Sequence, residues 1–362
     1  MKKKTIIVLM GGKNQEHEVS LQSALNILQA LSPEKYKIIP VGIDKSGAWS
    51  LLQGKQIEDY FLNPNNPKKI ALGENTTPCQ LKNEQNTCRL TAKNQTIKID
   101  LVFPVLHGKN AEDGTMQGFL EILSVPYVGS STLSSTVCFD KATTKILLQN
   151  IGIEVAPGEA IGINDPCLSF TQAIKKYGST LFVKPSQSGS SVGVHKVTSE
   201  KDYKQAITDA LKYDSVILIE SAIKGRELEC AVKGNSSIKG GTVQASEIGE
   251  VLIHANHEFY DYEAKYTDTQ VASTQIPANL TKEQKKNLQE YAVKAYKTLG
   301  CDGLARVDMF LTGDNRIYIN EVNTLPGFTN ISMYPKLWEA SGVSYSKLLD
   351  ELIDLAIQKN QS

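Results

Sequence analysis

The segment IYINEVNTLPGF at residues 317–328 places Asn320, Glu321 and Asn323 in a stretch that otherwise has the apolar pattern of a β-strand. Such a strand usually belongs to a core, and a core accepts an unpaired carboxylate only at a cost in free energy. The preceding segment, GLARVDMFLTGDNR at residues 303–316, ends in a Gly-Asp-Asn turn. The two segments therefore predict a β-hairpin in which the charge of Glu321 must be balanced by a neighbour.

Side-chain alternation along this hairpin predicts one polar face. With the turn at the Gly-Asp-Asn triplet, Asp308 lies opposite Glu321. By the same register, Arg306 lies opposite Asn323, and Ile319 is expected on the face of Glu321 and Asn323. Facing carboxylates repel, whereas Mg²⁺ accepts carboxylate and amide oxygens as ligands. A metal site is one interpretation, and a salt-bridge network on an exposed face is the other.

Composition limits the class of protein. The chain has 362 residues, enough for two or three domains, with 41% hydrophobic and 22% charged residues and a formal net charge of zero. That balance argues against a broad nucleic-acid or anionic-membrane surface. The apolar run at residues 6–10 is shorter than a signal-peptide core, and no run has transmembrane length. Six scattered cysteines without a CxxC pair favour reduced thiols and a cytoplasmic protein.

The order of patterns along the chain indicates an α/β fold. Residues 5–12, TIIVLMGG, predict a buried parallel strand, and residues 18–31 and 36–44 predict a helix and a second strand. These form a βαβ unit. Residues 46–98 are polar and predict short exposed strands and loops, with a hairpin extension as one form. SSTVCFDKATTKILLQNIG at residues 134–152 predicts one helix.

Three further segments could serve a nucleotide. The loop KPSQSGSSVG at residues 184–193 follows an apolar strand and could wrap an anion, with Lys184 as a point charge. In ILIESAIKGRELE, Glu220 ends a strand that could meet a purine edge, and Glu227 could bind ribose. The aromatic stretch at residues 258–268 is a candidate lid. Each has an ordinary alternative: a flexible hairpin, two surface glutamates and a structural loop. There is no GxxxxGK[ST] motif, and no GxGxxG follows a strand.

Five motifs taken together resemble the ATP-grasp superfamily, and most closely the D-alanine–D-alanine ligases. They are GGKNQEHEVS, LHGKNAEDGTMQG, KPSQSGSSVG, FYDYEAKY and NEVNTLPGF, and the resemblance runs from about residue 5 to residue 353. It implies a three-domain α/β ATP-grasp architecture. Residues 1–136 would form a Rossmann-like (pre-ATP-grasp) domain with a variable extension at about 46–98. Residues 137–233 would form the central lobe, and residues 234–362 the C-terminal lobe with the metal and substrate site.

The resemblance also implies an activity. Members of this family use ATP to join two D-alanines into D-alanyl-D-alanine through an acylphosphate, for peptidoglycan precursors of the cell wall. The implied cofactors are ATP and two Mg²⁺ (or Mn²⁺). The implied partners are D-alanine as a small-molecule substrate and a second copy in a homodimer, with no nucleic acid and no membrane. Alternatives are a D-alanine–D-lactate ligase, another ATP-grasp carboxylate–amine ligase, or a non-catalytic ATP-binding regulator.

Site residues follow from the matching family positions. The metal ligands would be Asp308, Glu321 and Asn323. Nucleotide binding would fall to Lys141, Lys184, Lys265, Glu220 and Glu227. The first D-alanine would meet Glu16 and His107, and Ser190 and Tyr266 would join Glu16 in a network that closes the lid.

Arg306 and the N–H of Gly327 would form an oxyanion hole. Ser332 and the Met333 backbone would hold the second carboxylate. Three of these residues have ordinary alternatives: Glu16 as a helix-start charge, His107 as a turn histidine, and Ser332 as a helix N-cap, a role that Asn330 could equally fill.

Overall fold

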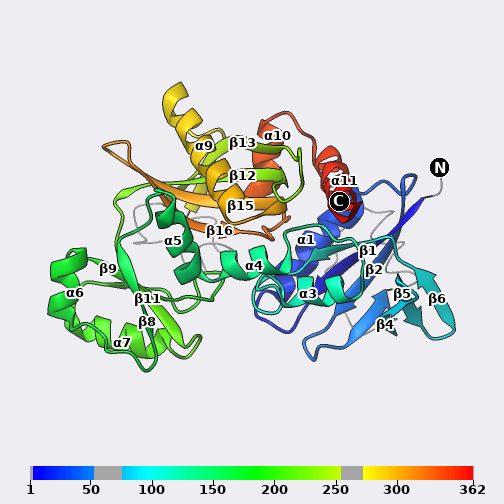
Figure 1. Ribbon diagram of the computed structural model, residues 1–362, viewed down its shortest axis with the longest axis horizontal. Coiled ribbons are helices and arrows are strands. Elements are labelled where there is room, and N and C mark those ends of the chain that lie inside the picture. Colours follow the sequence, from blue (N-terminus) through cyan, green and yellow to red (C-terminus); the bar gives the residue numbers. More distant parts are fainter. Residues whose placement is uncertain (1–2, 53–75, 254–271, 362) are drawn as a thin grey trace.

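The computed structural model describes residues 3–52, 76–253 and 272–361. Lys265 and Tyr266 lie outside these ranges. Within the described residues, the strands form three sheets, here called the first, second and third sheet in chain order. Figure 1 shows the first and second sheets at opposite ends of the molecule, with the third sheet above and between them. The site predicted from the hairpin belongs to the third sheet.

The first sheet has the order β6-β5-β4-β3-β2-β1-β7. Its strands are β1 (Lys4–Gly11), β2 (Tyr36–Ile43), β3 (Trp49–Leu52), β4 (Thr76–Glu84), β5 (Thr87–Ala92), β6 (Gln95–Lys98) and β7 (Leu101–Val105). β1 runs parallel to β2 and β7, and α1 (His17–Ala30) connects β1 to β2, so the predicted βαβ unit is confirmed. β3 to β6 extend the sheet with antiparallel pairs, so the described part of 46–98 does form short strands.

The second sheet is antiparallel, with the order β10-β9-β11-β8. Its strands are β8 (Gly158–Gly162), β9 (Leu181–Pro185), β10 (His195–Val197) and β11 (Val216–Ser221). The serine-rich loop connects β9 to β10, as predicted. Helices α6 (Phe170–Tyr177) and α7 (Glu200–Ala210) supply apolar residues that pack against the sheet strands.

The third sheet is also antiparallel, with the order β14-β13-β12-β15-β16. Its strands are β12 (Gly225–Asn235), β13 (Val243–Ile253), β14 (Ala272–Gln275), β15 (Asp302–Thr312) and β16 (Ile317–Asn323). Helix α9 (Lys282–Thr298) packs on one face of this sheet. Helices α10 (Met333–Ala340) and α11 (Tyr345–Gln361) also pack against strands of this sheet. The expected division after residue 233 falls inside β12, which pairs with β15 along its whole length.

The segment expected to form one helix at residues 134–152 forms two. They are α4 (Thr132–Phe139) and α5 (Lys141–Asn150), which follow α3 (Thr115–Ile122). Asp140 interrupts the helix with extended backbone angles, and its carboxylate accepts a hydrogen bond from the N–H of Thr143 at 2.9 Å. An aspartate that caps a new helix start costs less there than in a helix interior, which explains the break.

The predicted hairpin forms with the expected register. Asp308 pairs with Glu321, and Arg306 pairs with Asn323. A β-bulge then shifts the register, so that Met309 pairs with Ile319. Because of this extra residue, the expectation for Ile319 is wrong: its side chain lies in the hydrophobic core on the opposite face.

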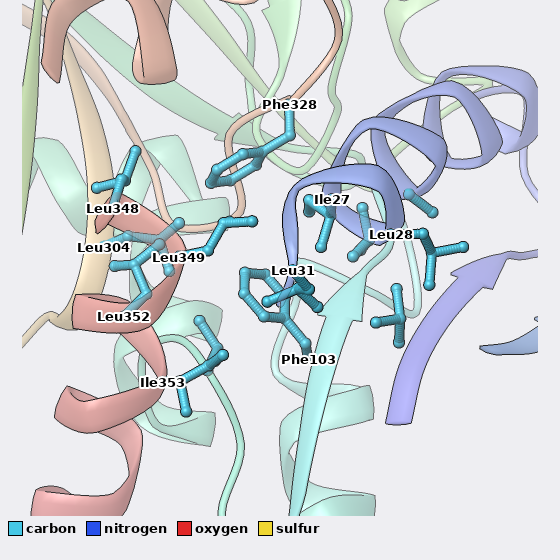
Figure 2. Close-up of a cluster of buried hydrophobic side chains, with 14 of the residues drawn as sticks. Ile27, Leu28, Leu31, Phe103, Leu304, Phe328, Leu348, Leu349, Leu352 and Ile353 are labelled. Atoms are coloured by element: carbon cyan, nitrogen blue, oxygen red, sulfur yellow. The ribbon is translucent and has the colours of Figure 1, made fainter. Parts of the chain in front are cut away.

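One hydrophobic cluster joins the first and third sheets. Figure 2 shows Ile27 and Leu28 of α1 and Phe103 of β7 near Leu304 of β15 and Leu352 of α11. These side chains are almost completely buried. The C-terminal helix therefore packs in the same core as the N-terminal sheet, and this core fixes the position of the third sheet.

Two general expectations can be compared with the described residues. All six cysteines are free thiols in the structure. In the described ranges, no helix combines the length and apolar character needed to cross a membrane.

The joint core makes a testable prediction for stability. Leu352 is fully buried in it. Leu352→Ala should lower the free energy of unfolding by about 2–5 kcal/mol, because it removes buried methyl groups and leaves a cavity. Lys347→Ala in the same helix is the control, since its side chain is 64% exposed and surface changes usually stay within about 0.5 kcal/mol. Urea unfolding measures both, and equal losses would contradict the proposed role of this core.

Candidate active site

Arg306 is the central cation of the hairpin face. Its Nε donates to Asp308 Oδ1 at 2.7 Å and its Nη2 to Asp308 Oδ2 at 2.6 Å. A second carboxylate, Glu229 of β12, places Oε2 3.1 Å from Nε. Burial disfavours the charged guanidinium, but Asp308 and then Glu229 outweigh it and raise the pKa of Arg306 well above its ordinary value. The expected salt-bridge network thus exists in part, but it is buried rather than exposed.

Glu229 was missed by the sequence reasoning. It pairs with Asp308 across β12 and β15, so both side chains lie on one face. Glu227, two residues earlier, pairs with Phe310 and lies on this face as well. The alternation Glu-Leu-Glu was the available signal, but it did not tell which strand would lie beside β12.

The two predicted metal-ligand carboxylates face each other, as expected. Glu321 Oε2 lies 3.6 Å from the Nζ of Lys141, and Asn323 Oδ1 accepts the N–H of Leu325 at 3.0 Å. Among the described residues, no group of three or more His, Cys, Asp or Glu side chains is placed to hold a metal ion. A cation at this face would therefore have Asp308, Glu321 and the amide of Asn323 as its protein ligands, and would need oxygen atoms from a bound molecule as well.

Two buried lysines share the carboxylate of Glu220. Lys145 Nζ lies 2.7 Å from Oε1, and Lys184 Nζ lies 2.9 Å from Oε2. Burial lowers the pKa of Lys145 to about 8. Burial would raise the pKa of Glu220, but Lys145 and then Lys184 outweigh it and lower that pKa. The carboxylate of Glu220 thus binds lysines, and it is buried rather than at the surface.

Lys184 also connects the second sheet to the bulge of the third. Its Nζ donates to Asn320 Oδ1 at 3.5 Å. Lys145 was missed by the sequence reasoning, although it follows Lys141 by four residues on α5 and so lies on the same side of that helix. Lys141, Lys145 and Lys184 therefore gather between the second and third sheets.

The serine loop is held by a lysine from α5 and by a hydrogen bond within the loop. Lys141 Nζ donates to the carbonyl of Ser188 at 2.6 Å, and the hydroxyl of Ser188 donates to the carbonyl of Val192 at 2.8 Å. Ser190 and Ser191 have positive backbone φ values of 50° and 59°, which residues other than glycine rarely adopt. These contacts disagree with a freely moving surface hairpin and show a loop held in a defined shape.

Glu16 connects this loop to the first sheet. Its Oε1 accepts a hydrogen bond from the hydroxyl of Ser190. A Cβ at Gly108 would overlap Oε2 of the same carboxylate, and Gly108 has a φ of 71°, a value that favours glycine, so this turn lies close to Glu16. Glu16 occupies the N-cap position of α1 but makes no side-chain cap hydrogen bond. The contact with Ser190 gives Glu16 a tertiary role beyond the helix start, and Tyr266, the other expected partner, lies outside the described residues.

His107 is buried beside these groups. Its Nδ1 lies 3.1 Å from the carbonyl oxygen of Leu325 and 3.8 Å from Glu112 Oε1. Burial would lower the pKa of His107, but Glu112 and then Glu16 outweigh it and raise the pKa above 6.5. Its Nε2 is buried and finds no hydrogen-bond partner among the described residues. That unpaired nitrogen disagrees with a fully satisfied turn histidine.

Gly327 and Ser332 lie next to each other. A Cβ at Gly327 would lie 2.7 Å from Ser332 Oγ. Ser332 takes the N-cap position of α10 but makes no side-chain cap hydrogen bond; instead its Oγ accepts the N–H of Thr329 at 3.0 Å. Met333 is the first residue of the helix, and its side chain is buried. The N-cap alternative for Ser332 is therefore right in position but not in hydrogen bonding.

The arrangement combines two chemical capacities. Between the second and third sheets, lysines from α5 and β9 offer positive charge to a polyanion, and the hairpin face offers oxygen ligands to a dication. The loops around Glu16 and His107 bring a carboxylate and an imidazole to the end of the first sheet. Such a combination suits the transfer of a phosphoryl group.

Comparison with known protein families agrees with this geometry. The family model "D-ala D-ala ligase N-terminus" matches residues 5–130, and "D-ala D-ala ligase C-terminus" matches residues 147–354. A D-alanine–D-alanine ligase of Oceanobacillus iheyensis is 46% identical over 99% of this chain and 96% of its own length. D-alanine–D-alanine ligase A of Salmonella typhimurium is 43% identical over 99% and 97%, respectively.

Solved structures give the same result. The D-alanine-D-alanine ligase of Coxiella burnetii has a TM-score of 0.86 and 37% identity, covering 100% of this chain and 96% of that one. The VanG D-Ala:D-Ser ligase of Enterococcus faecalis has a TM-score of 0.82 and 37% identity, with coverage of 98% and 100%. A Bacillus anthracis D-alanine–D-alanine ligase complexed with ATP has a TM-score of 0.73 and 30% identity, with coverage of 100% and 99%. The predicted ATP-grasp architecture with an N-terminal domain is thereby confirmed. The chain belongs to the D-alanine–D-alanine ligase family and is an ATP-dependent ligase.

Proposed function

We propose that this chain joins two D-alanines into D-alanyl-D-alanine, with ATP as the phosphate donor, in the synthesis of cell-wall precursors. The observation that carries the proposal is the hairpin face, where Asp308 is paired with Glu321 and bonded to Arg306. Lys141 of α5 and Lys184 of β9 face this hairpin. A regulator that only binds ATP has no need of a buried arginine beside its metal-ligand carboxylate.

The reaction would begin at the carboxylate of the first D-alanine. A free carboxylate is a poor acyl donor because oxide is a poor leaving group, and phosphorylation by ATP makes it a good one. Phosphoryl transfer depends on positioning and charge neutralisation. Lys141 and Lys184 would bind phosphate oxygens, together with Lys265 outside the described residues. Backbone groups near Glu220 would meet adenine, and Glu227 would bind ribose.

The donor set fits a hard cation. Both oxygens of Asp308 accept from Arg306, and Asn323 Oδ1 accepts from Leu325, but each oxygen has a second lone pair. Asp308, Glu321 and Asn323 would hold two Mg²⁺ or Mn²⁺ with help from the phosphates. When bound, these ions neutralise negative charge on the phosphates as the phosphoryl group moves.

The dipeptide would form in a second step. Glu16 would bind the ammonium group of the first D-alanine, and His107 would lie near its carboxyl end. Ser190 would hold Glu16, and Tyr266 would complete that network. The amine of the second D-alanine, whose carboxylate would bind Ser332 and the Met333 backbone, would attack the acylphosphate carbonyl. The electron pair of the neutral amine forms the new C–N bond, phosphate leaves with the electrons of the C–O bond, and the nitrogen gives up one proton to the departing phosphate or to solvent.

The intermediate of this step carries an oxyanion. Arg306 and the N–H of Gly327 would stabilise it through preorganised hydrogen bonds. The finer assignments of domain boundaries (1–136, 137–233 and 234–362), of a homodimer and of a cytoplasmic location belong to the same proposal. They rest on the family and on the bulk composition of the chain.

The second substrate is the point at which related enzymes differ. One structural neighbour is titled a D-Ala:D-Ser ligase at the same 37% identity as a D-alanine-D-alanine ligase. D-serine and D-lactate are therefore the relevant competitors. The amino group of D-alanine must lose a proton before it can attack, whereas D-lactate offers a neutral hydroxyl of similar size, so the charge and shape of the site around Ser332 and Ser190 would decide between them.

Phosphate release with a panel of D- and L-amino acids and D-lactate tests the activity. We expect phosphate release when D-alanine is the sole amino acid in the assay. When D-alanine competes with D-serine or D-lactate at neutral pH, D-alanyl-D-alanine should be the main product, as measured by mass spectrometry. A product made mainly of the ester, or of a D-serine dipeptide, would replace the proposed second substrate. A rate of phosphate release that does not change when any of the amino acids is added would contradict the proposed ligase activity.

Removal of a metal-ligand charge tests the hairpin face. Asp308→Asn and Glu321→Gln should each reduce turnover at least a hundredfold, because loss of charge stabilisation in the transition state costs about 3 kcal/mol or more. Glu154→Gln is the control, since Glu154 forms an exposed ion pair with Arg316 at the far end of the hairpin. Near-normal turnover of either site variant at ordinary Mg²⁺ would show that the metal assignment is wrong.

Lys145 offers a separate test of the lysine group. Without it, Lys184 is the cation that remains paired with Glu220 among the described residues, and less positive charge is left for phosphate. Lys145→Met should therefore raise the KM for ATP about tenfold, equivalent to about 1.4 kcal/mol. The exposed Lys212, paired with Asp209, provides the control Lys212→Met.

A second change makes this test specific. Because Lys145 would act through Glu220, the double variant Lys145→Met/Glu220→Gln should recover much of the affinity for ATP. Initial rates over a range of ATP concentrations measure all four proteins. A double variant that is as weak as Lys145→Met would refute this charge balance.

A further inference from the structure

We propose that Glu229 is a positioning residue: it keeps Arg306 paired when Asp308 turns to a metal ion. The inference rests on the proposed metal site at Asp308. No sequence motif pointed to Glu229, and its role follows from the contacts of two buried carboxylates with Arg306, whose side chain is 17% exposed. Among the described residues, the carboxylates of Asp308 and Glu229 lie within ion-pair distance of Arg306, and of these two Asp308 is the proposed metal ligand.

The geometry places the three groups in one buried patch. Glu229 and Asp308 lie opposite each other on β12 and β15, each with 7% of its side chain exposed. Arg306 contacts Glu229 through Nε, and contacts Asp308 through both Nε and Nη2. The two carboxylates are therefore not equivalent: Glu229 meets one edge of the guanidinium, and Asp308 accepts two parallel hydrogen bonds.

A metal ion changes this balance. Asp308 cannot give its full charge to a dication and to Arg306 at once. If Asp308 were the only partner, its shift to the metal would leave a buried guanidinium unpaired, which is strongly unfavourable. Arg306 would then compete with the metal for Asp308. Glu229 removes this competition, because Arg306 keeps one buried carboxylate in both states.

The exchange would also prepare the oxyanion hole. While Glu229 stays at Nε, the Nη2 N–H that Asp308 now accepts becomes available as a donor. A guanidinium carries five N–H groups in a rigid fork, so a partner at Nε fixes the direction of the others. Glu229 would thus hold Arg306 in place while its outer donors turn from a carboxylate to the reacting oxygen.

Mn²⁺ binding tests this without turnover. The full-length protein is mixed with a non-hydrolysable ATP analogue, and free Mn²⁺ is followed by electron paramagnetic resonance. Glu229→Gln should raise the dissociation constant of Mn²⁺ at least tenfold. Glu229→Asp keeps the charge but shortens the reach to Arg306, so it should weaken binding too, and an affinity like that of the wild type would overturn the proposal.

Glu250 provides a matched control. It forms a bidentate pair with Arg226, is as buried as Glu229, and pairs with Leu228 on the α9 face of the same sheet. Glu250→Gln therefore removes a buried carboxylate from an arginine without touching the site. Its Mn²⁺ affinity should stay within twofold of the wild type, and an equal loss in both variants would make the effect one of sheet structure and overturn the proposal.

A double-mutant cycle separates the contact from simple charge. In an Arg306→Gln background, Glu229→Gln should change Mn²⁺ affinity much less than in the wild type, because the residue through which it acts is gone. An equal change in both backgrounds means that Glu229 attracts the ion by its charge alone, which overturns the proposal.

Asp308→Asn separates this inference from the function on which it rests. If Asp308→Asn abolishes Mn²⁺ binding and Glu229→Gln does not affect it, only the role of Glu229 is refuted. If Asp308→Asn leaves binding unchanged, the metal site and the inference both fail.

Discussion

The pairing of Asp308 with Glu321 across β15 and β16 is the constraint on which the rest of the site depends. Two carboxylates at directly opposed positions of a sheet repel each other, and in a part-buried setting each needs a cation. Arg306, two residues from Asp308 on the same strand, supplies one. The other comes from Lys141 at the start of α5, outside the third sheet. The contact of Glu321 with Lys141 therefore holds the start of α5, which precedes the second sheet in the chain, close to the third sheet.

The other half of the site depends on how the first sheet packs. Phe328 belongs to the cluster that joins α1, β7 and α11, and its backbone is held by α1 on both sides. Its N–H donates to Ser23 Oγ at 3.1 Å, and its carbonyl accepts from Asn26 Nδ2 at 2.9 Å. Gly327 directly precedes this residue and Ser332 follows it four residues later, while Glu16 directly precedes α1. Helix α1 thus sets the distance between the groups proposed for the first and second D-alanines.

The sequence allowed the hairpin register to be predicted because strand alternation and a Gly-Asp-Asn turn together leave few possibilities. The bulge that turns Ile319 into the core could not be predicted from the hairpin alone, since Ile319 makes long-range contacts: its N–H donates to the carbonyl of Glu154 at 2.9 Å, and its side chain packs in a core that includes residues of α9. Glu229 was equally hidden, because strand order in a sheet is a long-range property. Lys145 was within reach, as its spacing of four from Lys141 places both on one side of α5.

Each proposed metal-ligand carboxylate already holds a cation: Asp308 holds Arg306, and Glu321 lies near Lys141. In the proposed function these same cations face the anions of the substrates. Binding of ATP with its metal would then exchange partners instead of burying new charges, so no ionic group is left unpaired in either state. Lys184 differs, because its partner Glu220 is not a proposed metal ligand and stays with it. Lys145, the second lysine at Glu220, matters for this reason: two lysines and one carboxylate together keep a net positive charge that can face the phosphates.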